Sequence, residues 1–154
     1  MHRVVAGTAD ALLVPGHVRE GARPTRLAVC VVTDHDHLKS ILGEYTRRGF
    51  KTAIDDFGAG YSGLNLLAEF QPDIIKLDMA LLRNIDSDPV RQAIVRGILG
   101  VCQALNIEVI AEGVETVAEL TFLRGIGVYL FQGYLLARPA YEQIPDVDWS
   151  KVPA

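Results

Sequence analysis

Two adjacent carboxylates, Asp55 and Asp56, are the residues of this chain best placed to do chemistry. They end a short β-prone run and precede a loop with Gly58 and Gly60, which can pass close to a ligand. Like charges side by side repel each other unless a cation or a donor neutralises them. Carboxylate oxygens suit hard divalent cations such as Mg²⁺ or Mn²⁺. The pair therefore predicts a metal site, and a solvated Asp-Asp turn is the competing interpretation of the pair alone.

Polar side chains also end the three strands predicted to follow. Lys76 and Asp78 end the first of these strands, Glu112 with Glu115 just beyond it the second, and Gln132 the third. Parallel α/β proteins bind ligands beyond the carboxyl ends of their strands, so we expect these groups around one rim. A lysine inside an otherwise apolar strand is costly to bury unless it is paired.

This combination of acids, a lysine and an amide favours metal-assisted hydrolysis. All four histidines lie in the first 37 residues, so the later chain offers no histidine as a general base. Two divalent ions can share a bridging carboxylate, activate a water and stabilise the charge that develops on a phosphodiester. Lys76 can orient that water or offset charge in the transition state.

Strands and helices that would position these residues alternate from residue 37 onward. We expect helical segments over 38–48, 64–68, 90–105 and 116–124. We expect strands over 27–32, 52–55, 73–78, 108–112 and 128–132. The alternation predicts an α/β chain with a parallel sheet.

The overall composition is that of an ordinary globular protein. Its 154 residues are 49% hydrophobic and 22% charged, which is enough for one domain with a core. A net charge of −4 without a basic stripe gives no reason to expect a nucleic-acid polymer as partner. No apolar run suits a membrane span or a secretory signal, and the two cysteines form no metal-like spacing. We therefore expect a cytoplasmic protein.

Four motifs resemble the EAL-domain family, bacterial phosphodiesterases that linearise the second messenger cyclic di-GMP. They are DDFGAGYS (55–62), DIIKLD (73–78), IAEGVET (110–116) and FQGYLLARP (131–139), in this order. The resemblance implies a partial TIM-like (β/α) barrel of the EAL type, of which this chain holds the C-terminal half to two-thirds. It also implies cyclic di-GMP as the ligand, linear pGpG as the product, and a two-metal Mg²⁺ or Mn²⁺ site at the strand ends.

The resemblance implies a role for each polar residue. Asp55 matches the carboxylate that bridges both metals, Asp56 matches a ligand of the second metal, and Glu112 matches a further ligand. The catalytic residues would be Lys76, beside the catalytic water, together with Glu112 and Gln132, which supports the water and the metal shell. The residues that order the site and couple it to dimerisation would be Phe57, Gly58, Gly60, Ser62 and Glu115.

Three of the family's ligands for the first metal have no counterpart in the sequence. The Glu-Ala-Leu or Glu-Val-Leu triplet does not occur, and Asn65, Asn84 and Asn106, the only asparagines, do not match the family's strand asparagine. Val31 stands where the family's Glu-x-Thr-Glu strand offers a ligand. We therefore expect weak metal binding and slow or absent hydrolysis by this chain.

The length of the chain and its residue pattern set the expected domain organisation. A closed eight-stranded barrel takes ~250 residues and rarely fewer than about 200. We expect a poorly readable segment over 1–36, the EAL-like domain over 37–145, and a tail over 146–154. The change of sequence pattern near residue 37 suggests a gene that has lost its 5′ part or a shifted early reading frame.

An open half-barrel exposes apolar edges, which favours a homodimer or other self-association.

Three functions remain open from the sequence. The first is a metal-dependent cyclic di-GMP phosphodiesterase, completed where necessary by another chain. The second is a catalytically inactive EAL-like module that binds cyclic di-GMP or a protein partner, and the third is a remnant without independent function. The missing ligands favour the second and third, whereas the retained acids and Lys76 favour the first.

Overall fold

The computed structural model describes residues 43–59, 63–69, 71–138, 141, 146–147 and 149–152. Nearer the N-terminus it describes the backbone of four two-residue strands, which are β1 (Arg3–Val4), β2 (Leu12–Leu13), β3 (Leu27–Ala28) and β4 (Cys30–Val31). The strand expected over 27–32 thus corresponds to two short strands. β3 pairs in parallel with the strand that begins at Lys51, whereas β4 pairs antiparallel with β1.

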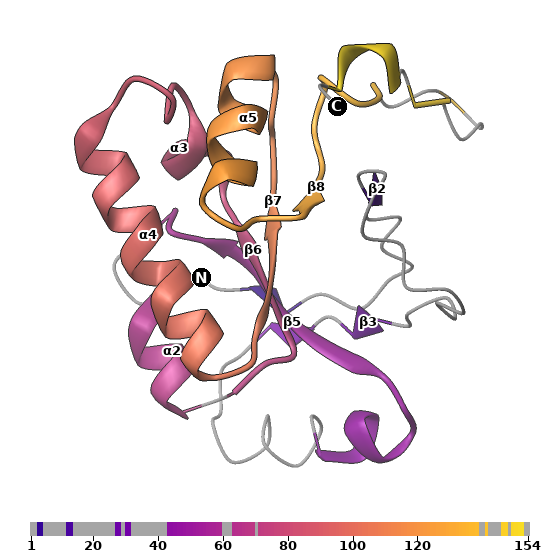
Figure 1. The fold of residues 1–154 in the computed structure, drawn as a ribbon. Coiled ribbons are helices and arrows are strands. Elements are labelled where there is room, and N and C mark those ends of the chain that lie inside the picture. The colour runs from indigo at the N-terminus through magenta and orange to yellow at the C-terminus, as the bar shows by residue number, and fades with distance from the viewer. Residues whose placement is uncertain are drawn as a thin grey trace.

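Four parallel strands form the part of the sheet that carries the polar residues (Figure 1). They are β5 (Lys51–Phe57), β6 (Ile74–Leu77), β7 (Glu108–Ala111) and β8 (Leu130–Phe131). Each strand pairs with the next in chain order. β1 and β2 pair antiparallel with β5 and β8 respectively. The predicted α/β class with a parallel sheet is confirmed, although β8 is shorter than the expected 128–132.

Among the described residues, four helices lie on one side of these strands (Figure 1). They are α2 (Gly63–Glu69), α3 (Met79–Leu82), α4 (Pro89–Ala104) and α5 (Val117–Gly125). A 3₁₀ turn, η1 (Trp149–Lys151), lies apart from them near the C-terminus. Residues 43–47 are also helical, within the expected 38–48. The sequence analysis missed α3, because a four-residue helix is too short to show a helical period. In the part of the chain that the structure describes, no helix has the length and apolar character needed to cross a bilayer.

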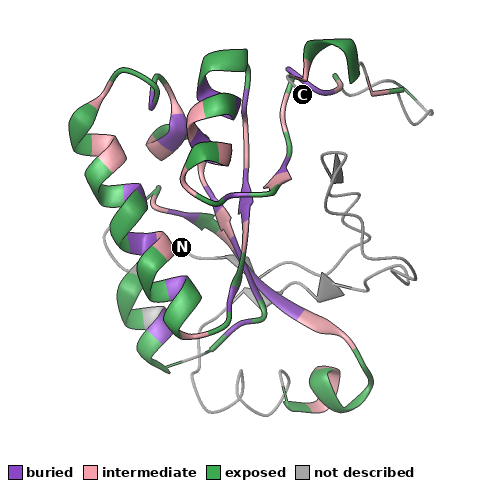
Figure 2. Cartoon of the chain, in the orientation of Figure 1, coloured by how far each residue is buried: buried purple, intermediate pink, exposed green. Residues whose placement is uncertain are grey.

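Alternation along the strands separates an apolar face from a face that ends in polar residues. The helix-side face joins the main core, to which the strands contribute Ile54, Phe57, Ile75, Leu77, Ala111 and Phe131. On the other face Ala53, Ile74 and Ile110 form a small apolar cluster with Leu130 packed against it. Figure 2 shows the strands largely buried and the outer sides of α4 and α5 exposed. Each of these four apolar residues is followed two positions later by a polar residue, and residues two apart in a strand share a face. These polar residues are Asp55, Lys76, Glu112 and Gln132.

At the amino ends of the strands, Asp73 links β5 to the start of β6 by hydrogen bonds. Its Oδ2 accepts from the backbone N–H of Thr52 at 2.7 Å and from the Thr52 hydroxyl at 2.9 Å. The Asp73 N–H donates to the Thr52 hydroxyl oxygen at 3.2 Å. Because Thr52 is buried, these bonds satisfy polar groups that water does not reach freely.

Replacement of Asp73 by Ala should lower the free energy of unfolding by about 1–3 kcal/mol, because it leaves two buried donors of Thr52 without their acceptor. Urea denaturation of the full chain measures the change. Asp86→Ala is the matched control, since Asp86 is exposed in the turn between α3 and α4 and should change stability by less than about 0.5 kcal/mol. Equal effects of the two substitutions would contradict the conclusion that the hydrogen bonds of Asp73 stabilise the pairing of β5 with β6.

Candidate metal centre

Asp55, Asp56 and Glu112 bring three carboxylates together at the carboxyl ends of β5 and β7. One oxygen from each lies within 4.8 Å of the other two. The side chains of Asp55 and Glu112 are only 17% and 16% exposed, whereas Asp56 is exposed. Three carboxylate oxygens at this spacing are a donor set that hard divalent cations prefer. The residues present therefore fit Mg²⁺ or Mn²⁺, and the predicted clustering of these three acids is found.

Lys76 lies between the acids because β6 lies between β5 and β7 in the sheet. Its Nζ is 2.7 Å from Asp55 Oδ1 and 2.5 Å from Glu112 Oε1, and its side chain is 12% exposed. Burial by itself lowers the pKa of Lys76, but hydrogen bonds and charge interactions with the two acids outweigh it and raise the pKa above 10.5. The lysine therefore stays protonated and compensates the acids when no metal is bound.

The pKa of Glu112 is raised above its ordinary value. Burial is the main cause because it disfavours the charged carboxylate, and the negative charges of Asp55 and Asp56 act in the same direction. The bond from Lys76 opposes both effects. The three clustered carboxyl groups thus offer more negative charge than the ammonium of Lys76 compensates, and this excess favours the approach of a cation.

A local irregularity in β5 allows two consecutive residues to join one cluster. Ile54 pairs with Ile75 and Phe57 with Leu77, so the β5 side has one residue more than the β6 side between these pairs. The extra residue falls at Asp55-Asp56, and Asp56 has a φ of 52°. Successive side chains of a regular strand point to opposite faces, whereas such a bulge redirects one of them. The bulge therefore explains how both aspartates reach the same rim.

Two other predicted site residues lie near the rim with partners of their own. The Glu115 carboxylate pairs with the Arg83 guanidinium at 2.6 and 2.9 Å, and this hydrogen-bonded pair lowers the pKa of Glu115. Gln132 is exposed, and its backbone N–H donates to Ala111 O at 2.8 Å while its carbonyl accepts from Val114 N at 3.1 Å. Their roles in ordering the site and in supporting the water stay predictions.

The remaining predicted residues divide between the core and the loop. The Phe57 side chain is buried in the main core, and Gly58 has a φ of 103° beside Leu81. Gly60 and Ser62 lie outside the described residues. Asp78, which the sequence analysis grouped with the polar strand ends, caps α3 by accepting from Ala80 N at 2.7 Å.

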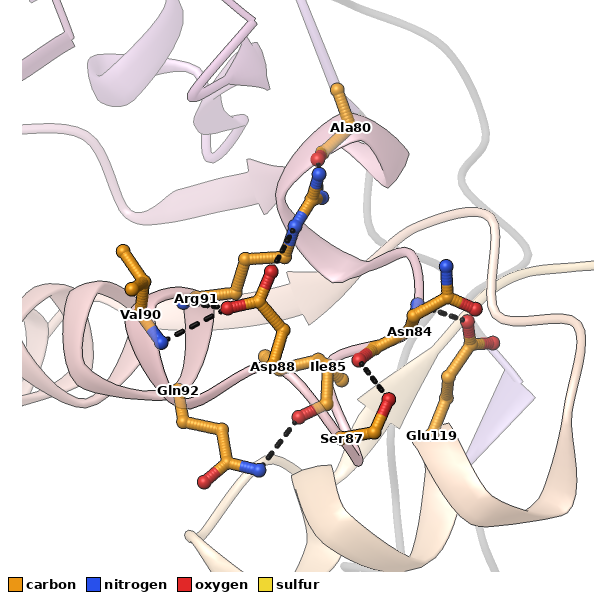
Figure 3. A network of polar contacts seen from close by, with 9 residues as sticks. All are labelled: Ala80, Asn84, Ile85, Ser87, Asp88, Val90, Arg91, Gln92 and Glu119. Carbon is orange, nitrogen blue, oxygen red and sulfur yellow. Dashed lines mark hydrogen bonds and ion pairs between the residues drawn. The ribbon is translucent and has the colours of Figure 1, made fainter.

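Sequence reasoning missed Glu119, a buried acid behind the rim that is 2% exposed. Its carboxylate accepts from the backbone N–H groups of Asn84, Glu115 and Thr116 at 3.0–3.1 Å. Figure 3 shows it reaching Asn84 in the turn that follows α3, beside the Asp88 cap of α4. The Thr-x-x-Glu spacing of a capping box at Thr116 could have revealed it. Glu119 therefore holds the β7–α5 loop against the turn after α3.

The pKa of Glu119 is lowered below its ordinary 4.5: burial alone would raise it, but bonds from the backbone N–H groups of Asn84, Glu115 and Thr116 outweigh burial. A depressed carboxyl pKa contributes stability that is complete above pH 4.5 and is lost as the pH falls through the folded-state pKa.

We expect Glu119→Gln to lower the free energy of unfolding by about 1–3 kcal/mol at pH 7, because one amide group cannot accept from all three donors. The gap from the parent chain should narrow as the pH falls below 4.5. Denaturant titrations between pH 7 and pH 3 measure the gap. Glu108→Gln, an exposed partner of Lys51, is the control and should cost about 1 kcal/mol or less. A gap that does not change with pH would overturn this account.

Comparison with known families assigns the chain. The EAL domain family matches residues 18–139, and the chain belongs to this family. The resemblance predicted from the four motifs is confirmed. The match begins inside the segment 1–36 that the sequence analysis could not assign, and the predicted boundary at residue 37 stays a prediction.

The chain is similar to several named proteins, of which it spans a part. Cyclic di-GMP phosphodiesterase PdeR of Escherichia coli is 44% identical over 110 residues, which are 71% of this chain and 17% of PdeR. The blue light- and temperature-regulated antirepressor BluF of E. coli is 39% identical over 119 residues, which are 77% of this chain and 30% of BluF.

Solved structures give the same family. The standalone EAL protein of Vibrio cholerae O395 in its c-di-GMP-bound form has a TM-score of 0.73 and 51% identity, over 79% of this chain and 52% of that one. BlrP1 of Klebsiella pneumoniae, in a complex with manganese and cyclic di-GMP, has a TM-score of 0.70 and 47% identity, over 75% and 29%. BlrP1 is also known in complex with calcium. These likenesses confirm the partial TIM-like barrel of the EAL type, and they show that relatives in this family bind divalent metal.

Proposed function

We propose that this chain carries part of a cyclic di-GMP phosphodiesterase site, which hydrolyses cyclic di-GMP to linear pGpG with low activity. The observation that carries the proposal is the cluster of Asp55, Asp56 and Glu112 around Lys76 at the strand ends. PdeR, a relative at 44% identity, is a cyclic di-GMP phosphodiesterase, and the similar Vibrio and Klebsiella structures hold the same nucleotide.

Asp55, Asp56 and Glu112 are the residues that would hold Mg²⁺ or Mn²⁺. Bound metal supplies a nucleophilic hydroxide and Lewis-acid stabilisation of the phosphodiester. In our proposal Asp55 would be a ligand of the metal, and Gln132 would orient the attacking water. Lys76 pairs with Asp55 and Glu112, and its ammonium would offset the charge that develops on the phosphate.

Low activity follows from the ligands that the sequence does not contain. Loss of a residue that only supports a ligand already costs 10–100-fold in metal affinity or activity, so loss of direct ligands costs more. Val31 stands at the position where the family offers a ligand. A second chain that supplies the missing carboxylates would raise the activity.

Turnover of cyclic di-GMP with Mn²⁺ by the parent chain and by Lys76→Ala tests the proposal. We expect slow pGpG formation by the parent and a loss of about 10²–10³-fold in the variant, because the ammonium stabilises the transition state. Calorimetry should find Mn²⁺ bound at least as tightly by Lys76→Ala, because the variant has no ammonium to compete with the metal for Asp55 and Glu112.

Lys51→Ala is the matched control for this experiment. Lys51 pairs with Glu108 at 2.6 Å, on the same strands β5 and β7 but at the opposite edge of the sheet. Its replacement should leave turnover and metal binding unchanged. Equal turnover by the parent and Lys76→Ala, or no turnover by the parent, would refute the catalytic proposal.

The second candidate function is binding without catalysis. The antirepressor name of BluF, a relative at 39% identity, favours it, as do the absent metal ligands. Binding of cyclic di-GMP without turnover would support an inactive module that binds the nucleotide. Absence of both would leave a module for a protein partner or a remnant without independent function.

We further propose that the chain works in the cytoplasm and self-associates through an uncovered strand edge or through α2, the helix after the DFGAGYS loop. Leu64 of α2 is 60% exposed, on a helix that also contributes the buried Leu67 to the core. Apolar side chains left in water favour association between copies.

Leu64→Arg should convert a dimer into a monomer of 16.8 kDa in light scattering at micromolar concentration, if α2 forms the interface. Val90→Arg on α4, where Val90 is 66% exposed, is the matched control and should leave the mass unchanged. Association that survives Leu64→Arg would assign the interface to the strand edge. A parent chain that is itself a sharp monomer would exclude self-association at this concentration.

A further inference from the structure

The short helix α3 contacts both loops that follow the acids of the metal centre, one after β5 and one after Glu112. On the β5 side, Leu81 packs against Gly58, which lies two residues after Asp56. The backbone N–H of Asp78, the residue that caps α3, donates to Phe57 O at 3.0 Å. α3 is thus joined to the β5 loop by one side-chain contact and one backbone hydrogen bond.

On the β7 side, α3 meets the loop that follows Glu112. A Cβ added at Gly113 would lie 2.5 Å from the Cβ of Met79, so the loop backbone is in close contact with the helix. Arg83, directly after α3, pairs twice with Glu115. The next residue, Asn84, donates its backbone N–H to Glu119 at 3.0 Å, as Figure 3 shows.

Both loops touch α3 at glycines for a steric reason. Gly58 and Gly113 have φ values of 103° and 67°, and an added Cβ at either would collide with Leu81 or Met79. The close contacts fix the backbone two residues after Asp56 and one residue after Glu112. β5 and β7 each pair with β6, which sets the distance between the strands, whereas the loops that follow Asp56 and Glu112 extend beyond this pairing. The Lys76 ammonium links Asp55 and Glu112 by ion pairs, and α3 packs against both loops.

We propose that α3 holds the loops that follow β5 and Glu112 at the spacing of the metal centre, and that Leu81 and Arg83 are positioning residues for Asp56 and Glu112. Leu81 acts on the β5 loop and Arg83 on the β7 loop. This inference deepens the proposed function, because the cluster matters as a metal site only if that function holds. Its first test therefore uses neither metal nor nucleotide.

Amide hydrogen exchange on the full chain provides that test. The Asp78 amide reports the β5 side through its bond to Phe57 O, and the Glu112 amide reports the β7 side through its bond to Leu77 O at 3.1 Å. The Glu108 amide, bonded to Asp73 O at the opposite edge, is the internal reference. We expect Leu81→Ala to speed exchange at Asp78, and Arg83→Ala to speed it at Glu112, at least about tenfold relative to Glu108.

Leu105→Ala is the matched control. Leu105, like Leu81, is a partly buried leucine packed against the main core, but it lies after α4 near the start of β7. Its replacement should change exchange at the three amides by the same factor. The conservative variants Leu81→Met and Arg83→Lys should restore most of the protection. Exchange in Leu81→Ala and Arg83→Ala that rises equally at the two rim amides and at Glu108 would overturn the proposal.

Mn²⁺ titration by calorimetry is the second readout. Leu81→Ala should weaken Mn²⁺ binding about 10–100-fold, as replacement of residues that support metal ligands does, and Leu105→Ala should not. Normal Mn²⁺ binding by Leu81→Ala would overturn the positioning role. If the parent binds no Mn²⁺, the exchange experiment decides the role of α3 alone, and the metal-dependent function fails separately.

Discussion

Charge compensation at the carboxyl edge of the sheet is the constraint on which this structure depends. Carboxylates from β5 and β7 meet in a largely buried place, where burial and, to a smaller extent, the negative charges of Asp55 and Asp56 raise the pKa of Glu112. Lys76 makes the arrangement possible because β6 lies between the two acidic strands and its ammonium reaches both sides. In the proposed function, divalent cations would take the place of the ammonium as counter-charge.

The rest of the fold keeps this edge in place. One face of the strands packs with the helices in the main core, which leaves the other face to a small apolar cluster and, beyond it, the charged residues. At the far edge the Thr52–Asp73 bonds set β5 against β6. Behind the rim, buried Glu119 joins the β7–α5 loop to the turn after α3. Packing thus fixes the strands, and polar contacts fix the loops between them.

Membership of the EAL domain family provides the functional interpretation of these residues, and differences between this chain and the family limit that interpretation. The chain spans about half of the standalone Vibrio protein and less than a third of PdeR, BluF and BlrP1. It has three acids and a lysine at the rim but lacks the family's Glu-Ala-Leu triplet. Binding of a nucleotide needs fewer exactly placed charges than activation of a water molecule. The loss of metal ligands therefore affects catalysis more than binding.

The sequence by itself determined the family, the α/β class and the identity of the clustered acids, because motifs and strand alternation are local properties of the chain. It predicted that Asp55, Lys76 and Glu112 share a rim, since parallel strands end at one edge. Only the tertiary structure decided how Asp56 joins them, because the bulge in β5 exists only relative to its pairing with β6. It also decided that Phe57 enters the core and that α3 spans the two loops, since these contacts join residues far apart in the chain.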